Sequence, residues 1–178
     1  MIKQRTTLIL VVIFVALAAV AYALDVSQRN NTPPDQFPTA QPELFTGVQP
    51  TQITRMVLEN HATGLQITLV KVPGGWQGTD KNGQPIQVDP GQPPRMLQIL
   101  STLRYNRVME GSDVKAFGLA DGGMFSVNFD AGRSYTLLVG DLNSDSSFAF
   151  VQRGVGSAIV QVPAQSIRTL LTPVLASQ

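Results

Sequence analysis

The chain has 178 residues, no cysteine and a formal net charge of +1, from 13 basic and 12 acidic residues. The absence of cysteine excludes disulfides, thiolate metal sites and lipid attachment at a cysteine. A nearly neutral chain has no basic field to hold nucleic acid, so nucleic acid is not expected as a partner. Charged residues make up only 14% of the sequence, which suggests that part of the surface lies against another molecule.

The N-terminus carries one unbroken apolar run, from residue 8 to residue 24. A helix rises about 1.5 Å per residue, so this run and the two threonines before it approach the ~30 Å hydrocarbon core of a bilayer. Residues 1–24 are therefore predicted to form a single-pass transmembrane anchor. Lys3 and Arg5 precede the run, and basic residues beside a span tend to stay in the cytoplasm. We expect a cytoplasmic N-terminus and an extracytoplasmic C-terminal domain.

Small residues recur in the outer half of this run, where Ala19 and Ala23 share one face at helical spacing. Because close helix approach in lipid depends on small residues, Ala16, Ala19 and Ala23 are predicted to pack against a helix of another integral membrane protein subunit. The alternative is an anchor that contacts membrane lipid alone. A cleaved signal peptide is the competing interpretation of the whole run, since Ala21-Tyr22-Ala23 has the small-x-small form that signal peptidase accepts.

Residues 25–50 are rich in Pro, Asn, Gln and Thr and show little apolar periodicity. Proline removes backbone donors and favours extended conformations, so this tract is predicted to be a semi-stiff stalk. Its large apolar residues are Phe37, Leu44 and Phe45. Two interpretations stay open: these side chains pack on the domain's own core, or they form a docking point on a partner.

Residues 51–178 are predicted to form one α+β domain. In its first half, Leu65, Ile67 and Leu69 alternate with polar neighbours, which predicts a strand with one buried face. Residues 53–59 supply a partner strand, and two Gly-containing turns lead to further strands near residue 76 and at residues 86–88. A helix then opens at Pro93-Pro94, where missing amide donors cost nothing. Its apolar stripe consists of Met96, Leu97, Leu100 and Leu103.

The second half repeats this order. Strands are predicted near residues 125–129, 135–139, 148–152 and 158–162, followed by a helix that Pro163 opens and Pro173 bends or ends. Because residues 86–90 resemble residues 159–163, we predict a duplicated strand-strand-strand-helix unit. The expected fold class is α+β: after the transmembrane helix, an antiparallel-sheet domain built from two such units, in one or two sheets, with helices on one face.

Several short motifs in order resemble the family called domain of unknown function 4340: Gly74-Gly75-Trp76, Phe117-Gly118-Leu119, Val139-Gly140-Asp141 and Val162-Pro163. The resemblance covers about residues 44–171. It implies a membrane-anchored, extracytoplasmic domain of the bacterial cytoplasmic membrane, sometimes found beside transporter auxiliary or gliding-type components, with no catalytic residues to carry over. The prolines usual in the family after the second motif are replaced here by residues 120–123, so that turn is looser.

No strong catalytic or metal motif is present. Asp141, Asn143 and Asp145 occupy positions one, three and five of a calcium loop, but the glycine at position six and the glutamate at position twelve are missing. A solvated connection between strands is therefore favoured over calcium. Ser112 and Lys115 have the Ser-x-x-Lys spacing of penicillin-recognising enzymes without their partner motifs, so Ser112 is interpreted as a helix N-cap. No cofactor is expected.

His61 is the only histidine and is predicted to lie in a hairpin turn, away from any serine or second ligand. Together these features predict a non-catalytic accessory or scaffold subunit that docks a larger membrane protein complex on its extracytoplasmic face. The complex would be a transporter, a secretion or motility machine, or an energy-converting assembly. The alternative is a stand-alone extracytoplasmic ligand-binding or envelope-sensing module, with a groove lined by Trp76, Phe125, Phe129 and Tyr135. An enzyme is not expected.

Overall fold

The computed structural model describes residues 41–109 and 113–175, which belong to one compact unit that begins at Gln41. No helix within these residues has both the length and the apolar character needed to cross a membrane. The predicted anchor lies outside the described residues, and so do Ala16, Ala19, Ala23 and Phe37.

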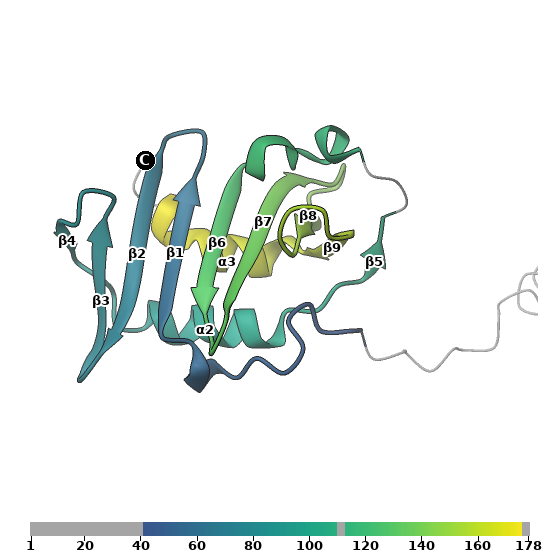
Figure 1. The fold of residues 1–178 in the computed structure, drawn as a ribbon. Coiled ribbons are helices and arrows are strands. Elements are labelled where there is room, and N and C mark those ends of the chain that lie inside the picture. The colour runs from purple at the N-terminus through teal and green to yellow at the C-terminus, as the bar shows by residue number, and fades with distance from the viewer. Residues whose placement is uncertain (1–40, 110–112, 176–178) are drawn as a thin grey trace, which may run out of the picture. The chain divides into compact units, whose positions relative to one another are not determined.

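In the part of the chain that the structure describes, nine strands form one sheet in the order β4-β3-β2-β1-β6-β7-β8-β9-β5 (Figure 1). Every neighbouring pair is antiparallel. The predicted antiparallel α+β domain is therefore confirmed. The strands are β1 (Arg55–Asn60), β2 (Leu65–Val72), β3 (Gly75–Asp80), β4 (Pro85–Ile86), β5 (Arg107–Val108), β6 (Phe125–Asp130), β7 (Ser134–Leu142), β8 (Phe148–Gln152) and β9 (Ile159–Pro163).

Two α-helices, α2 (Gln92–Thr102) and α3 (Ala164–Leu175), lie on the same side of the sheet (Figure 1). Helix α3 contacts β1, β2, β8 and β9 and also packs on α2. Of the two alternatives predicted for Pro173, that it ends the helix is excluded, because α3 continues to Leu175. Val174 is fully buried on the same stripe as Leu170, and this packing holds the last turn in place.

The same order of elements occurs twice. The first half consists of β1–β4 and α2, the second half of β6–β9 and α3, and the two halves join through their first strands, β1 and β6. Each half has four strands rather than the three predicted. The fourth strand differs most between the halves, because β4 has two residues whereas β9 has five.

The main core lies between the sheet and the two helices. Alternation along the strands sends one set of side chains toward the helices, and the predicted stripe on α2 faces the same core. Burying one such aliphatic side chain contributes roughly 1.5–3 kcal/mol. The most deeply buried members include Met56, Leu58, Val127, Phe129, Leu137, Met96, Leu100 and Leu170.

Residues 41–49, here called the strap, belong to the domain and not to a free stalk. Leu44 and Phe45 are only 4% and 1% exposed. The ring of Phe45 packs edge-on against Phe129 at 5.0 Å and against Tyr135 at 5.6 Å between ring centroids. The interpretation of Leu44 and Phe45 as docking residues is therefore corrected: they pack on the domain's own core, because aromatic and aliphatic side chains gain most from full burial.

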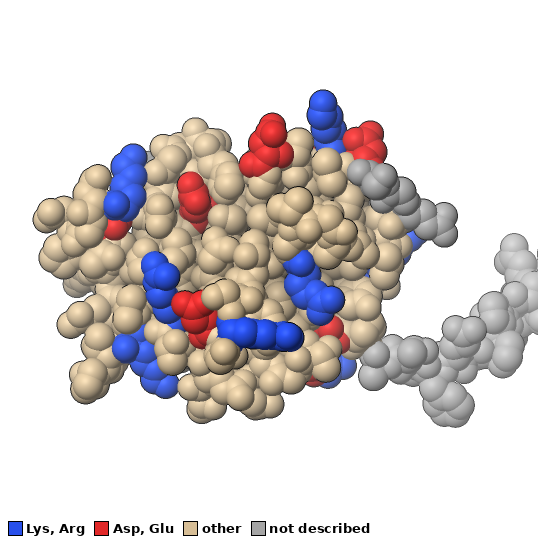
Figure 2. All heavy atoms as spheres, in the orientation of Figure 1, with Lys and Arg blue, Asp and Glu red and all other residues tan. Residues whose placement is uncertain are grey.

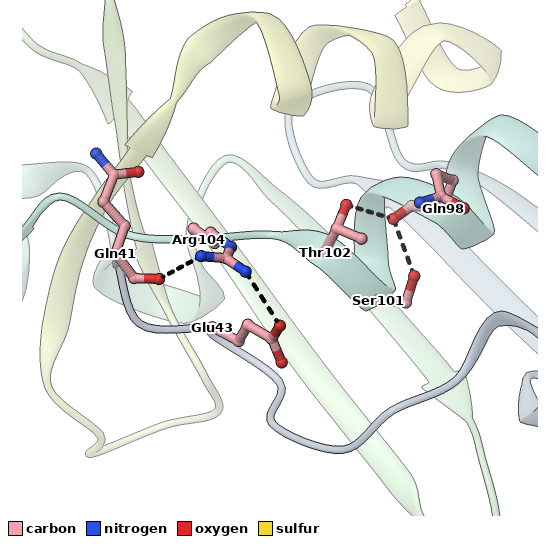
Figure 3. Close-up of polar contacts among 6 residues, drawn as sticks. All are labelled: Gln41, Glu43, Gln98, Ser101, Thr102 and Arg104. Carbon is pink, nitrogen blue, oxygen red and sulfur yellow. Dashed lines mark hydrogen bonds and ion pairs between the residues drawn. The ribbon is translucent and has the colours of Figure 1, made fainter. Parts of the chain in front are cut away.

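Hydrogen bonds fix the strap to both halves. The Leu44 amide donates to the Leu103 carbonyl at 2.7 Å, and the Arg153 guanidinium donates to the Leu44 carbonyl at 3.2 Å. Arg104, just after α2, donates to the Gln41 carbonyl at 3.2 Å and pairs with Glu43 at 3.5 Å (Figure 3). In the same view, hydroxyl donors at the end of α2 close its last turn onto the Gln98 carbonyl. The chain therefore enters the domain at one fixed point.

Candidate interaction surface

One side of the sheet faces away from the helices. Over β3, β2, β1 and β6, none of the described elements covers this side (Figure 1). Strand register places five uncharged side chains in one row across this area. The Thr136 hydroxyl donates to Asn128 Oδ1 at 2.7 Å within this row. We call the area the open face; it comprises Val57, Gln66, Thr68, Val70, Gln77, Thr79, Asn128 and Thr136.

Charged side chains are sparse on this side of the molecule. Arg55 lies opposite Asp130 and Glu59 opposite Ser126 on the same side of the sheet. Figure 2 views this side and shows charged groups of both signs in a largely uncharged surface, some of them side by side in its lower part. Val70, a large apolar residue, is 38% exposed here. A partner that covers the central row alone would desolvate no charge, but its own polar groups would have to hydrogen-bond the amide and hydroxyl side chains of the row.

The same side of the sheet is covered over β7, β8 and β9. The connection from β5 to β6 crosses it, and it contains two short 3-10 turns, η2 (Val114–Phe117) and η3 (Ala120–Gly122). Its described residues 113–123 are here called the shield. A second small core lies beneath it and includes Leu119, Leu138 and Ile159, while the rings of Phe117 and Phe150 pack at 4.7 Å.

Direct backbone contact holds the shield on β7. Gly140 is buried, and a Cβ atom at this position would overlap the Phe117 carbonyl oxygen and lie 2.9 Å from Leu119 Cγ. Gly118 adopts the left-handed conformation that ends η2, with φ of 66°. The motifs Phe117-Gly118-Leu119 and Val139-Gly140-Asp141, far apart in sequence, are thus packed on each other.

The start of the shield differs from the prediction. Asp113, not Ser112, is the residue that caps η2, since its side chain accepts hydrogen bonds from the amides of Lys115 at 3.1 Å and Ala116 at 3.4 Å. Ser112 itself lies outside the described residues. A carboxylate suits this position because it accepts from the Lys115 amide and shares the Ala116 amide with the Asp113 carbonyl, which lies 3.2 Å from it.

A family model described as domain of unknown function (DUF4340) matches residues 76–176, more than half of the chain. The chain belongs to the DUF4340 family. The match begins in β3, later than residue 44 where the sequence resemblance begins, and includes α2, the shield and the whole second half. The chain matches no curated protein and no solved structure.

In this DUF4340 domain the three calcium candidates lie at the connection between β7 and β8. Asn143 Oδ1 accepts a hydrogen bond from the Phe148 amide at 2.9 Å. The Asp145 carboxylate accepts from the hydroxyl and the amide of Ser147, and these bonds lower the pKa of Asp145. Asp141, at the end of β7, packs against Gly118. Among the described residues no three His, Cys, Asp or Glu side chains gather to hold a metal ion. The geometry supports a self-closed loop rather than calcium binding.

His61 is not isolated, contrary to the sequence-based expectation. Its Nε2 lies 3.2 Å from Ser126 Oγ, because pairing of β1 with β6 brings the end of β1 beside the start of β6. Strand pairing over 65 residues leaves no local signal in the sequence. Ser126 is only 5% exposed, and within the described residues no carboxylate hydrogen-bonds His61. The pair ties the β1–β2 turn to β6 and does not present a nucleophile.

The aromatic residues of the DUF4340 domain do not line a groove between the halves. Phe129 is buried and stacks on Tyr135 with ring centroids 5.0 Å apart and planes 9° apart. Trp76, Phe125 and Tyr135 are partly buried against the main core. The groove predicted for the ligand-binding alternative is therefore filled by the side chains that were expected to line it. The alternation of polar and apolar residues along β2 predicts that one side of this strand is polar. How far the open face extends depends on which strands lie beside β2.

Proposed function

We propose that this protein is a non-catalytic, membrane-anchored accessory subunit whose domain docks on the extracytoplasmic face of a larger membrane protein complex. The observation that carries this proposal is the open face, where a row of five uncharged side chains crosses the sheet and no described element covers it (Figure 1). The corresponding area of the second half is covered by the chain's own shield. In this account a partner subunit of a transporter, secretion, motility or energy-converting assembly supplies the missing cover.

The strap supports the same proposal. Residues 1–24 would anchor the chain in the bacterial cytoplasmic membrane, with Ala16, Ala19 and Ala23 against a partner helix, and Phe37 would lie in the stalk. The chain then enters the domain through Leu44 and Phe45, which are locked in the core. A displacement at Gln41 is thus transmitted to the whole domain. Such coupling suits a subunit held at a fixed place on a complex.

A second function is favoured by a different observation. A hollow of about 440 Å³ lies on the helix side of the sheet, away from the open face. Its size is that of a small-ligand site, about 300–1,000 Å³. A stand-alone extracytoplasmic ligand-binding or envelope-sensing module would use this hollow.

The docking proposal is tested by placing one charge on the open face. In the full chain, Thr68→Arg puts a guanidinium in the middle of the row, and Thr102→Arg places the same side chain at the exposed end of α2. After mild detergent extraction of native membranes, native gels are expected to show wild-type protein and Thr102→Arg in a large complex. We expect Thr68→Arg to migrate as free subunit with an unchanged urea midpoint.

Two outcomes would count against the proposal. Migration of the wild-type chain only as a free monomer would remove the partner complex altogether. Retention of Thr68→Arg in the complex would show that the partner does not cover the open face, because burying an unpaired guanidinium is strongly unfavourable.

A further inference from the structure

The hollow on the helix side of the first half has an apolar floor and walls. Leu65, Ile67 and Leu69 of β2 line it, together with Ile86, Val88 and Pro173. Ile67 and Leu69 are buried members of the main core, so the hollow reaches down to that core. Its accessible aliphatic surface comes from the partly buried side chains of Leu65, Ile86 and Val88.

The short fourth strand of the first half borders the hollow through Ile86. β4 ends at Ile86, and the chain leaves the sheet before α2 begins at Gln92. In the second half β9 runs for five residues and leads directly into α3, with Val160 and Val162 buried. In the first half, the segment after β4 lines the hollow with Val88 and Asp89, together with Leu65 and Ile67 from the start of β2.

Gly78 in β3 sets the wall of the hollow. A Cβ atom at Gly78 would lie 2.5 Å from Val88 Cγ2 and 2.8 Å from Ile86 Cγ1. These two side chains therefore rest on bare backbone, which holds them at a fixed height beside the cavity. The hollow is preformed by packing and needs no rearrangement to accept a ligand.

Two carboxylates, Asp80 and Asp89, are the charged groups among the described residues that line the hollow, and no basic residue belongs to this lining. Asp80 Oδ1 accepts hydrogen bonds from the amides of Asn82 and Gln84, both at 2.8 Å. Asp89 Oδ1 accepts from the Gly91 amide at 2.9 Å. Local turns thus orient both carboxylates, and the amide of Gln84 is the main cause of a lowered pKa of Asp80. Lys81 is exposed beside Asp80 and is not part of the lining.

We infer that this hollow binds a lysine side chain of a partner polypeptide together with the aliphatic residue next to it. The apolar floor accepts the aliphatic residue and the lysine methylenes, while the ammonium pairs with Asp80 and Asp89. Lysine suits this lining because its aliphatic stem can lie on the apolar floor while its ammonium stays at the carboxylates. The hollow and the open face lie on opposite sides of the sheet, so this inference does not depend on the docking proposal.

The test uses the full chain in lipid nanodiscs, labelled at the isoleucine δ1 methyl groups, and the soluble probe N-acetyl-leucyl-lysine amide. Saturable NMR shifts are expected at Ile67 and Ile86 up to about 10 mM probe, where a Kd of about 1 mM is nearly saturated. The matched probe N-acetyl-leucyl-norleucine amide lacks the ammonium and is expected to bind at least about fivefold more weakly. Added salt should weaken only the lysine probe.

Variants of the carboxylates assign the effect. Asp80→Asn and Asp89→Asn keep an Oδ1 that accepts the same amide bonds, so the turns are preserved. Each is expected to weaken the lysine probe about fivefold, as for a partly exposed ion pair. The matched control Asp113→Asn changes a capping aspartate in the shield and should leave the affinity unchanged.

Three results would overturn the inference: no saturable shift at Ile67 and Ile86, equal binding of the two probes, or unchanged affinity in both pocket variants. None of them bears on Thr68→Arg, which alters the other side of the sheet. Failure of lysine binding and failure of docking are therefore distinguishable.

Discussion

The two halves of the sheet have the same order of elements, yet their outer sides differ. In the second half the outer side carries Leu138 and Ile159, and the shield buries both. In the first half the corresponding area carries Thr68 and Val57, and no described element covers it. The composition of each outer side therefore matches its cover: apolar under the shield, and mainly polar where it is bare. The open face is therefore not an unfinished core, and in the docking proposal it is the surface that a partner contacts.

The halves also differ on the helix side. β9 completes the second half, whereas β4 stops after two residues and borders the hollow beside Asp80 and Asp89. Both features that a partner could use thus lie in the first half. The second half serves mainly as a closed scaffold that holds the strap through Phe129 and Tyr135.

The largest expected effect comes from removing the contact of the strap with the second half. Phe45→Ala deletes a fully buried ring that packs on Phe129 and Tyr135, so the free energy of unfolding should fall by about 4 kcal/mol. Urea denaturation of the full chain measures this change. The neighbouring exposed residue gives the control, Thr46→Ala, which should change stability by less than about 0.5 kcal/mol. Similar values for the two variants would show that the strap is not part of the core.

The next effect separates the shielded half from the bare half. Gly140→Ala places a methyl group against the Phe117 carbonyl, so the shield must move away and stability should fall by about 3 kcal/mol. Gly91→Ala, at the start of α2, is the control, because Gly91 has φ of −79° and an added Cβ atom would meet Asp89 Oδ1 only at 3.4 Å. Denaturation curves that rank Gly91→Ala as the more damaging change would contradict the close crossing of shield and β7.

A smaller effect tests the cap of the shield. Asp113→Ala removes the acceptor of the Lys115 and Ala116 amides, and about 1 kcal/mol should be lost. Amide hydrogen exchange should quicken in η2 while β1 and β2 stay protected. Lys115→Ala changes an exposed residue of the same turn and should leave exchange as in the wild type. Equal protection in both variants would mean that the cap is dispensable.

The smallest expected effect is on the pH dependence of stability, and it compares one turn in each half, at Asp80 and at Asp145. The pKa values of Asp80 and Asp145 are both lowered by hydrogen bonds to their carboxylates. A lowered folded-state pKa contributes stability that is present above the unfolded value of 3.8 and is lost as pH falls below it. Asp80→Asn and Asp145→Asn should therefore each lose less stability than the wild type between neutral pH and the acid range. Steeper acid loss in the variants would reverse the assigned sign.

Local patterns in the sequence predict most elements of the fold but not their long-range neighbours. The alternation of Leu65, Ile67 and Leu69 and the prolines at the start of α2 are local signals, and both elements form as predicted. Packing of Gly140 under Phe117 and contact of His61 with Ser126 depend on which strands become neighbours. No spacing rule supplies that information, because sheet order is decided by the whole set of strands.

The burial of Leu44 and Phe45 shows the same limit at the strap. Their proline-rich surroundings indicate a linker and left core packing as one of two interpretations, and the sequence does not tell that the Phe45 ring packs on Phe129 of β6 and Tyr135 of β7. Composition reports only the local preference of the segment for an extended linker. Packing against the core decides where residues 41–49 finally lie. The open face was visible as alternation along β2, but its cover could not be assigned before the path of the shield was known.

Photo-crosslinking in native membranes tests the central claim most directly. A benzophenone side chain replaces Gln77 on the open face or, as the matched control, Gln98 on the exposed side of α2 in the full chain. The docking account predicts a discrete crosslinked product with another integral membrane protein from position 77 and none from position 98. Products from position 98 alone, or from neither position, would contradict it.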